Sequence, residues 1–196
     1  MLILGQALEK GIEVTALARD PLKLGEFRNS VSTVQGSAAD LEAVERVVAG
    51  NDIVLSALGL VHGSPPGLMT TSSSHMVAAM KRQGSKRLVI LTNTAIEDPS
   101  DRTPLTHRVL RLVLKRFNEP LWLDSRNAAK VVEESGLDWT LVRAPILTDG
   151  PKTGKYRVGA LKGGMSLRVS RADVAAFMLS CALEGGHVRE KPVIAG

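Results

Sequence analysis

The sequence predicts an α/β fold in which helices cover both faces of a parallel sheet. Strand-like and helix-like segments alternate along the 196 residues. Several strand candidates are short β-branched runs without polar alternation, which is typical of parallel strands buried on both faces. The length and the apolar share of 44% fit one domain with a core of ordinary size. We therefore expect a doubly wound, three-layer α/β/α domain that spans residues 1–196.

The first elements are a helix at residues 2–10 and a strand at residues 13–19 that ends in Arg19. In a dinucleotide-binding βαβ unit, the same helix follows a strand and a glycine-rich turn that holds the pyrophosphate. No such strand or turn stands before Leu2. An arginine at the end of the next strand offers a guanidinium fork to a 2′-phosphate, whereas an acidic residue would bind the ribose hydroxyls. These segments predict NADP binding by a unit that lacks its first strand and glycine turn.

The next segments continue the alternation of strands and helices. Residues 31–35 indicate a strand, Asp40 caps a helix with an apolar stripe, and residues 52–59 form the clearest strand of the chain. Glycines and prolines forbid regular structure in the loop at residues 61–67. A loop that follows a buried parallel strand is a place where ligands bind.

An insertion separates the next two strands. A helix that ends at Gly84 precedes a buried strand at residues 87–92. A lid-like helical insertion then covers about residues 98–122, in which Pro104 begins one helix and Pro120 breaks it. A second helix leads on to the next strand.

The C-terminal part repeats the same units. Residues 139–143 indicate a strand, which Pro145 ends because proline cannot donate to a sheet ladder. Ser170 and Asp173 have the spacing of a capping box and open the next helix. Residues 193–195 form a last short strand.

Four stretches occur in the same order and at similar spacing in a known group of proteins. They are Ala-Arg-Asp-Pro-Leu-Lys-Leu at 18–24, Asp-Ile-Val-Leu-Ser-Ala-Leu-Gly at 52–59, Glu-Ser-Gly-Leu-Asp-Trp-Thr-Leu-Val-Arg-Ala-Pro at 134–145 and Val-Ser-Arg-Ala-Asp-Val-Ala at 169–175. On these stretches the chain resembles the atypical short-chain dehydrogenase/reductase superfamily, in its NAD(P)H-binding, NmrA-like branch, and most closely the flavin reductase and biliverdin reductase B type. The resemblance covers nearly the whole chain and implies a Rossmann-like fold, NADP(H) as cofactor and hydride transfer.

In that family the first strand is central in the sheet. Its loss would leave a gap of two strand spacings, roughly 9 to 10 Å, which sheet hydrogen bonds cannot cross. Each backbone group left buried and unsatisfied would cost roughly 1 to 3 kcal/mol. We therefore expect a strand and a Gly-x-x-Gly-x-x-Gly turn to be encoded upstream of a misassigned or trimmed start. An N-terminally truncated, inactive product is the other interpretation.

The resemblance assigns the adenosine end of the cofactor to three residues. Arg19 stands where similar proteins grip the 2′-phosphate, and Lys23 matches another basic position of that grip. Ser37 stands where the family often has an aspartate beside the adenine. The alternative interpretations, which involve no cofactor, are that Arg19 is a surface arginine paired with an acid and that Ser37 lies in an ordinary turn.

Two strand ends are expected to approach the rest of the cofactor. Ala57, Leu58 and Gly59 lie beside the topological switch point, where a glycine lets the backbone come close to ribose and pyrophosphate. Thr92 and Asn93 end the next strand, where the family places a small polar residue near the nicotinamide. Asn93 stands where similar sequences of the family often have a serine. Its side-chain amide can still make a hydrogen bond there but is a weaker candidate for a proton donor. Asn93 is nevertheless the candidate catalytic group.

The segment Pro145, Ile146 and Leu147 matches the one that packs against the nicotinamide and its carboxamide. The biliverdin-reductase-like proteins have a histidine at the position of Ile146, which argues against that substrate. Tyr156 has no lysine four residues later, so the Tyr-x-x-x-Lys acid of other short-chain dehydrogenases is absent. No histidine has a metal-like partner spacing, and we expect no metal.

The composition excludes several kinds of partner. The formal charge is +5, but basic residues are spread along the chain and aromatic residues make up only 3%, so we expect no nucleic acid. No segment is long and apolar enough to span a bilayer, and no signal peptide is evident. The single cysteine, Cys181, fits a reducing cytoplasm. We expect a small-molecule substrate and a monomer or weak homodimer.

Together these features predict an NADPH-dependent oxidoreductase that transfers hydride to a small planar acceptor such as a quinone or flavin. The cofactor carries the hydride, so the protein need supply only orientation and an apolar slot. The alternative is a non-catalytic, NADP-sensing regulator of the NmrA-like kind, with a protein partner. The truncated, inactive product remains a third interpretation. Turnover of NADPH separates an enzyme from a sensor.

Overall fold

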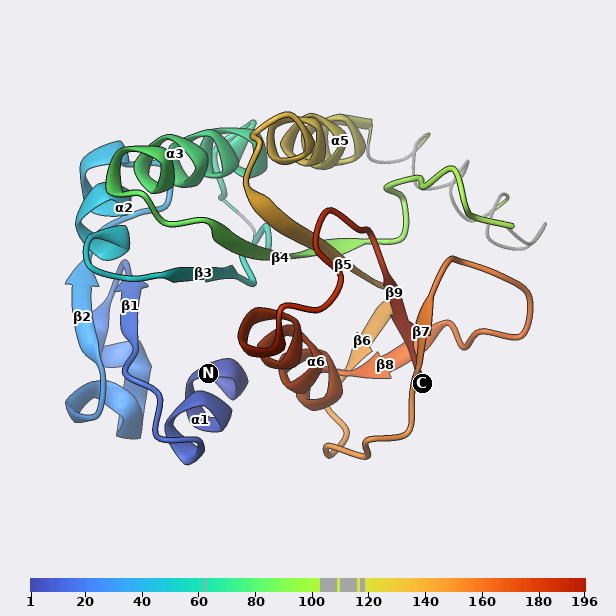
Figure 1. Cartoon of the computed structure of the whole chain (residues 1–196), viewed down its shortest axis with the longest axis horizontal. Coiled ribbons are helices and arrows are strands. Elements are labelled where there is room, and N and C mark those ends of the chain that lie inside the picture. Colours follow the sequence, from blue (N-terminus) through green and yellow to red (C-terminus); the bar gives the residue numbers. More distant parts are fainter. Residues whose placement is uncertain (62, 103–108, 110–115, 117–118) are drawn as a thin grey trace.

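The computed structural model describes residues 1–61, 63–102, 109, 116 and 119–196 (Figure 1). Its helices are α1 (Leu2–Glu9), the 3-10 segment η1 (Pro21–Asn29), α2 (Leu41–Val48), α3 (Leu68–Gln83), α5 (Glu119–Glu133) and α6 (Arg171–Glu184). Its strands are β1 (Thr15–Ala18), β2 (Ser32–Gln35), β3 (Ile53–Ser56), β4 (Arg87–Asn93), β5 (Asp138–Ala144), β6 (Ile146–Thr148), β7 (Arg157–Gly159), β8 (Arg168–Ser170) and β9 (Val193–Ala195). Helices α2, α3 and α5 lie on one side of the strands and α1 and α6 on the other, which confirms the three layers (Figure 1).

The main sheet has the order β3-β4-β5-β9-β7. Its strands run parallel except β7, which is antiparallel to β9. The longest ladder pairs β4 with β5, from Arg87 opposite Asp138 to Asn93 opposite Ala144. Helices α3 and α5 connect successive strands on one face and α6 leads to β9 on the other, so the sheet is doubly wound as predicted. Strand β7 and the separate β6–β8 pair were not predicted.

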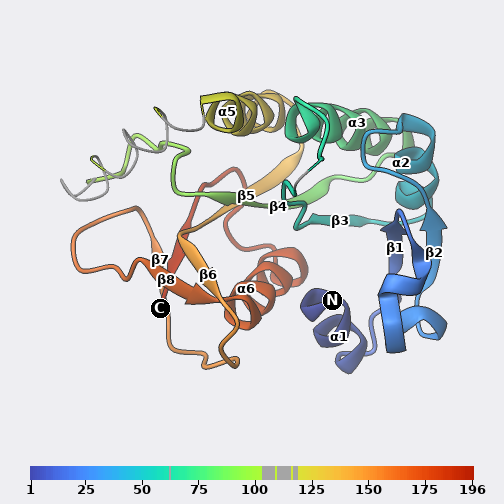
Figure 2. The ribbon, with the colours of Figure 1, turned by 180° about the vertical axis from the view of Figure 1, so that it is seen from behind.

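The sheet is interrupted between β1 and β3. Strand β1 pairs in parallel with β2, and no backbone hydrogen bond among the described residues joins β1 to β3. Figure 2 shows the β1–β2 pair at one end of the molecule, with β3 as the nearest strand of the main sheet. We call the unpaired edges of β1 and β3 the seam. The seam confirms the predicted break in the sheet, because these are the two strands that the family's first strand would join.

Apolar side chains on both sides of the seam pack onto the helices. Leu17 of β1 and Val54 of β3 contact the apolar cluster that includes α2 and α3, and Leu55 contacts the cluster around α6. All four residues of β3 stay partly exposed, whereas Leu88 and Val89 of β4 are 0% exposed. A parallel strand between two helical layers is normally buried on both faces. The residual exposure of β3 is therefore explained by its unpaired edge.

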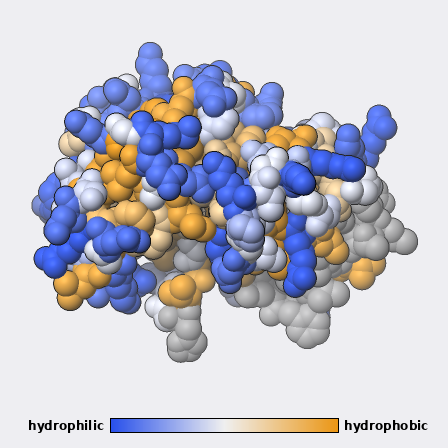
Figure 3. Space-filling view, turned by 90° about the horizontal axis from the view of Figure 1, so that it is seen from below, coloured by the Kyte–Doolittle hydropathy of each residue, from blue (hydrophilic) through white to orange (hydrophobic). Residues whose placement is uncertain are grey.

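Helix α1 is only partly covered for the same reason. The helix is rich in apolar residues, yet Ala7 is its one buried residue and Leu2 is 47% exposed. It is attached to α6, where the Gln6 side chain donates to the Ala172 carbonyl at 3.0 Å. Figure 3 shows apolar patches on the face seen from below, the side of α1 and α6. An apolar helix face that lacks the strand beneath it keeps this kind of exposure.

Local signals set two helix starts as predicted. The Asp40 carboxylate accepts a hydrogen bond from the Glu42 amide at 3.1 Å where α2 begins. The Ser170 hydroxyl accepts from the Asp173 amide at 2.9 Å where α6 begins. Both bonds satisfy an amide that a helix leaves unpaired in its first turn.

The predicted lid is corrected at its C-terminal end. The described part of α5 begins at Glu119, so Pro120 lies within a helix at the position where a break was predicted. Residues 119–122 therefore belong to α5 and not to a lid-like insertion at about 98–122. Residues 103–108, 110–115 and 117–118 of that insertion lie outside the described residues.

Candidate functional site

The parallel strands place most of the predicted site residues at one edge of the main sheet. Strands β3, β4 and β5 are parallel neighbours, so their carboxyl ends lie on the same side. Residues 57–59 follow β3, Thr92 and Asn93 end β4, and residues 145–147 follow β5. Arg19, Lys23 and Ser37 lie with the β1–β2 pair, on the other side of the seam. The seam therefore divides the predicted site into two groups of residues, which we call the adenosine half (Arg19, Lys23 and Ser37) and the acceptor half (the residues at the ends of β3, β4 and β5), after the roles predicted for them.

Arg19 follows directly after β1 and is exposed. The nearest acid in sequence, Asp20, uses its carboxylate to accept from the Leu22 amide at 3.0 Å. Among the described residues, neither the Arg19 guanidinium nor the Lys23 ammonium makes an ion pair or a hydrogen bond. The alternative of a paired surface arginine is therefore not seen, and two unneutralised cations are available to an anion.

Ser37 takes part in a local turn. Its hydroxyl accepts from the Ala39 amide at 3.2 Å, as in the ordinary turn that was the alternative interpretation. The preceding Gly36 is required by packing, because a Cβ there would lie 2.3 Å from the Ala43 Cβ of α2. This segment is shaped by the contact between β2 and α2, and nothing in its geometry singles out an adenine.

Residues 57–59 lie beyond the end of their strand. Strand β3 ends at Ser56, three residues earlier than predicted at Gly59, because the seam leaves this strand with one partner only. Ala57 and Gly59 are exposed and Leu58 is half-buried. A Cβ built on Gly59 would meet nothing within 4 Å, so the space in front of this glycine is open. The protein's own packing does not require a glycine here.

Asn93 is held by both ends of its side-chain amide. Its Oδ1 accepts from the Ala95 amide at 2.9 Å, and its Nδ2 donates to the Ser125 hydroxyl at 3.3 Å. Ser125 is a buried residue of α5 that sequence reasoning did not single out. Thr92, the preceding residue, is half-buried. Asn93 therefore fixes the turn that follows β4 and is poorly placed to donate a proton.

A second missed residue, Asp124, is also on α5. Its buried carboxylate accepts from the Met69 amide at 3.0 Å, the Thr70 amide at 2.9 Å and the Thr70 hydroxyl at 2.6 Å. It thereby caps α3, whose own N-cap residue is Gly67 and has no side chain to do so. The cap fixes the point where the loop after β3 enters α3. Its 54-residue separation from Thr70 explains why a local capping pattern did not reveal it.

The segment after β5 forms an apolar shelf, which we define as Pro145, Ile146 and Leu147. The Ile146 amide donates to the Leu167 carbonyl at 3.0 Å, within the β6–β8 pair. Ile146 is 54% exposed and Leu167 is 41% exposed, while Leu147 packs partly buried against the α6 cluster. An exposed apolar surface of this kind suits a flat ring.

Asp173 holds the loop that follows this shelf. Its carboxylate accepts from the amides of Thr153 and Gly154, each at 2.8 Å, and from the Ser170 hydroxyl at 2.8 Å. Burial alone would raise the pKa of Asp173, but these hydrogen bonds outweigh it and hold the pKa below its ordinary value. Asp173, in the first turn of α6, therefore also anchors the chain beside the shelf.

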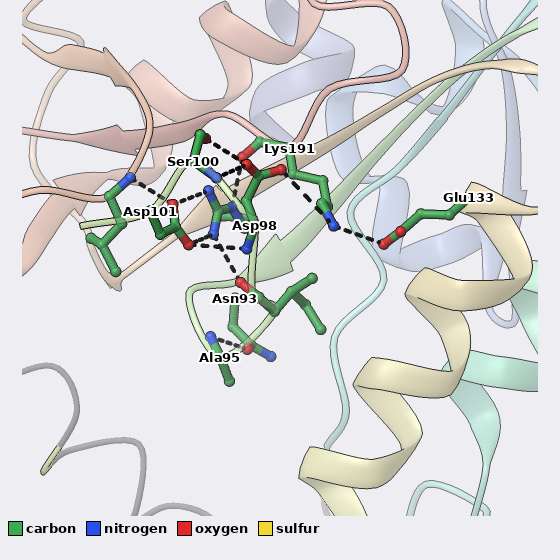
Figure 4. Close-up of polar contacts among 10 residues, drawn as sticks. Asn93, Ala95, Asp98, Ser100, Asp101, Glu133 and Lys191 are labelled. Atoms are coloured by element: carbon green, nitrogen blue, oxygen red, sulfur yellow. Dashed lines mark hydrogen bonds and ion pairs between the residues drawn. The ribbon is translucent and has the colours of Figure 1, made fainter. Parts of the chain in front are cut away.

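A buried ion pair closes the carboxyl end of the β4–β5 ladder (Figure 4). Arg143 of β5 is 0% exposed and binds Asp101 in two places, at 2.6 Å and 2.9 Å. Burial alone would raise the pKa of Asp101, but hydrogen bonds from Arg143 and the Leu161 amide outweigh it and hold the pKa low. We call this pair the clasp.

These features fit a nicotinamide dinucleotide at both ends. Arg19 and Lys23 suit a phosphate on the adenosine side, and the shelf suits the nicotinamide. The space in front of Gly59 is open, and no side chain caps the first turn of α1, whose amides are of the type that holds anions. The family's glycine turn is the one element for which no described residue substitutes.

Comparison with known proteins identifies the family to which the chain belongs. The chain matches the NAD(P)H-binding family over residues 1–184. It is similar to a Rossmann-fold NAD(P)-binding family protein from Shigella flexneri, with 25% identity and a TM-score of 0.74 over 98% of this chain and 85% of that one.

Two further solved structures share the fold. One is a short-chain dehydrogenase/reductase from Veillonella parvula in complex with NADP, with 19% identity and a TM-score of 0.77 over 99% of this chain and 88% of that one. The other is ChuY, an anaerobillin reductase from Escherichia coli O157:H7, with 19% identity and a TM-score of 0.78 over 99% and 89%. The family match spans most of the chain. The chain belongs to the NAD(P)H-binding family and has its Rossmann-type fold.

Proposed function

We propose that this protein is an NADPH-dependent reductase that passes hydride to a small planar acceptor such as a quinone or flavin. The observation that carries the proposal is the pair of cations at the carboxyl end of β1, Arg19 and Lys23, which have no ion-pair partner among the described residues. A guanidinium without an acidic partner favours the extra phosphate of NADPH over the ribose hydroxyls of NADH. That one neighbour in fold is a reductase adds support.

In this proposal the residues of the chain orient the partners and exclude water. Arg19 and Lys23 bind the 2′-phosphate, Ser37 lies beside the adenine, and residues 57–59 line the ribose and pyrophosphate. The shelf and Thr92 cover the nicotinamide, which supplies the hydride when the cofactor is bound. Removing water from such a slot strengthens the remaining polar contacts.

Among the residues that the structure describes, none supplies an acid at the shelf, which favours a particular class of acceptor. Both polar atoms of Asn93 are engaged, and Ile146 and Leu147 carry no proton to give. A quinone or flavin accepts hydride without a protein proton, because its anionic product is delocalised and gains its proton from water. We therefore favour acceptors of this class over simple ketones, which need a positioned acid.

A panel of quinones and free flavins with NADPH tests the proposal. We expect NADPH oxidation with at least one acceptor, and a rise in the KM for NADPH of about tenfold or more in Arg19→Ala, a loss of about 1.4 kcal/mol in binding. Arg28→Ala, which removes another exposed arginine of the same region, serves as the control and should leave the KM unchanged. Equal KM values for NADPH in the Arg19 variant and wild type would refute the assigned role.

One observation favours a second candidate, an NADP-sensing regulator of the NmrA-like kind. A sensor needs no catalytic group, and the engaged side chain of Asn93 leaves none at the shelf. Such a protein would bind NADPH without consuming it and would change its affinity for a protein partner. A truncated, inactive product would do neither, so binding and turnover together separate the three possibilities.

We also propose a cytoplasmic, monomeric or weakly dimeric protein with a small-molecule substrate and no nucleic-acid partner. Cys181 is the single cysteine, so this chain forms no disulfide within itself, which fits a reducing compartment. Burial raises the pKa of its thiol to about 11 and makes it unreactive. No helix in the described part of the chain has the length and apolarity to cross a membrane.

A further inference from the structure

The clasp does more than close a ladder, because it links the two strand ends that form the acceptor half of the site. Arg143 is the residue before the last of β5, and two residues further on the shelf begins at Pro145. Asp101 belongs to the segment that leaves β4 after Asn93. The ion pair therefore joins the β4 exit to the β5 exit, on the side where the acceptor is expected.

Both members of the clasp make further hydrogen bonds besides the ion pair. The Arg143 guanidinium also donates to the Ile96 carbonyl at 2.9 Å and to the Lys191 carbonyl at 2.6 Å. The Asp101 carboxylate also accepts from the Leu161 amide at 2.8 Å. A buried ion pair repays its desolvation only when its geometry is good and its remaining groups are bonded, as they are here. The clasp thus fixes three backbone segments at once.

The hydrogen bond from Arg143 to the Ile96 carbonyl connects the clasp to the turn that contains Asn93. The Ile96 amide donates to the Asn93 carbonyl at 3.3 Å, and the Ala95 amide donates to the Asn93 side chain at 2.9 Å. Residues 93–96 therefore form one closed turn, with Arg143 holding the carbonyl at its far end (Figure 4). Removal of the Arg143 side chain would remove this guanidinium donor from the Ile96 carbonyl.

A ring of weaker charges surrounds the clasp. The Lys191 ammonium lies 3.2 Å from the Glu133 carboxylate of α5 and 3.9 Å from Asp98. The Asp98 amide in turn donates to Asp101 at 3.1 Å. These contacts connect the loop after β4, through Asp98, to α5 and to the residues that lead into β9.

We propose that Asp101 and Arg143 are a positioning pair that sets Asn93 against the shelf and so decides which planar acceptors fit between them. Neither residue is assigned contact with acceptor or cofactor; both act through the turn at residues 93–96. The proposal rests on the proposed reductase function for its substrate, whereas the positioning itself is a property of the protein alone.

The test replaces Asp101 by asparagine, which keeps the size of the side chain and removes the charge that Arg143 needs. Hydrogen exchange measured without any ligand should accelerate about tenfold or more at residues 93–96 and not in the centre of β4. In turnover, the KM for acceptors should rise by about tenfold while the NADPH dissociation constant stays within about twofold, and the preference between a small quinone and a larger flavin should change. Asp149→Asn, which breaks the exposed pair with Arg171, is the matched control.

Each outcome decides a separate point. A lower melting temperature with unchanged acceptor preference and unchanged exchange at residues 93–96 would show a purely structural ion pair and overturn the proposal. If Asp101→Asn does not fold, Asp101→Glu keeps the charge with a longer stem and should show the same changes in milder form. If the wild-type protein fails to oxidise NADPH with every acceptor of the panel, the proposed function is contradicted. Hydrogen exchange at residues 93–96 would still decide whether the clasp positions this turn.

Discussion

The seam and the β4–β5 joint are opposite extremes of strand pairing within one fold. At the joint, the ladder runs from Arg87 opposite Asp138 to Asn93 opposite Ala144, and the clasp closes its end. At the seam, β1 and β3 share no ladder, and apolar side chains on the flanking helices hold the two sheets together. The acceptor half of the predicted site therefore lies on strands joined by backbone hydrogen bonds. The adenosine half lies on the β1–β2 pair, which is attached to the rest of the molecule through side-chain packing.

This difference shows what a ladder adds beyond apolar burial. Hydrophobic contact is non-directional, so it keeps β1 near the main sheet without fixing its register. Backbone pairing fixes register residue by residue. We therefore expect the acceptor half to be rigid in the absence of ligand, and the adenosine half to open at lower free energy.

Breaking the clasp has the largest expected effect on stability. Arg143→Ala leaves the Asp101 carboxylate, whose side chain is 6% exposed, without its bidentate partner. Removing one member of a buried ion pair costs about 3 to 5 kcal/mol, which urea unfolding followed by circular dichroism would measure. Arg171→Ala, which breaks an exposed pair with Asp149, should cost about 1 kcal/mol or less. Equal losses in the two variants would contradict the role given to the clasp.

A pair of identical truncations compares the joint with the seam directly. Leu88 of β4 is 0% exposed, and Leu88→Ala should lower the free energy of unfolding by about 2 to 5 kcal/mol. Leu55 of β3 is only partly buried beside the seam, so Leu55→Ala should cost less than about 2 kcal/mol. Urea titrations of both variants give the difference. A larger loss for Leu55→Ala would mean that β3 is better packed than its unpaired edge indicates.

Acid should lower the free energy of unfolding by weakening the hydrogen bonds to Asp101 and Asp173. This effect should be smaller than those of Arg143→Ala and Leu88→Ala. The pKa values of Asp101 and Asp173 lie below the ordinary value of 3.8, since hydrogen bonds to their carboxylates outweigh the effect of burial. The unfolded chain then binds more protons than the folded chain as pH falls below about 4, so this stabilisation is complete above that pH and is lost below it. Unfolding in urea between pH 7 and pH 3 should show the loss, and Asp173→Asn should show less of it. Stability that stays constant down to pH 3 would disagree with these pKa directions.

Much of the fold was predictable because its signals are local. Asp40 and Ser170 cap the helices they were expected to cap, and the β-branched run before Asn93 is a buried parallel strand. The break in the sheet was also predicted, because the resemblance implied a central strand between β1 and β3. Arg19 was predictable as a strand-end cation, but its lack of an ion-pair partner became visible only in the structure.

The rest depends on residues that are distant in sequence. The clasp joins residues 42 positions apart, and the Asp124 cap joins residues 54 positions apart, so neither leaves a periodic or spaced pattern. The β6–β8 pair consists of three-residue strands whose partners lie 22 positions apart, which is too short and too distant for a local pattern to reveal. The break predicted at Pro120 was wrong because a proline marks many helix boundaries but can also lie within a helix.

A thermal-shift titration of the chain with NADPH and NADH tests the central claim most directly, because it asks whether the adenosine half binds a cofactor across an unpaired seam. A ligand at one hundred times its dissociation constant stabilises the folded state by about 2.7 kcal/mol. We predict a larger shift with NADPH than with NADH, lost in Arg19→Ala and kept in Arg28→Ala. No shift with either cofactor, or an equal shift in the Arg19 variant, would contradict the account.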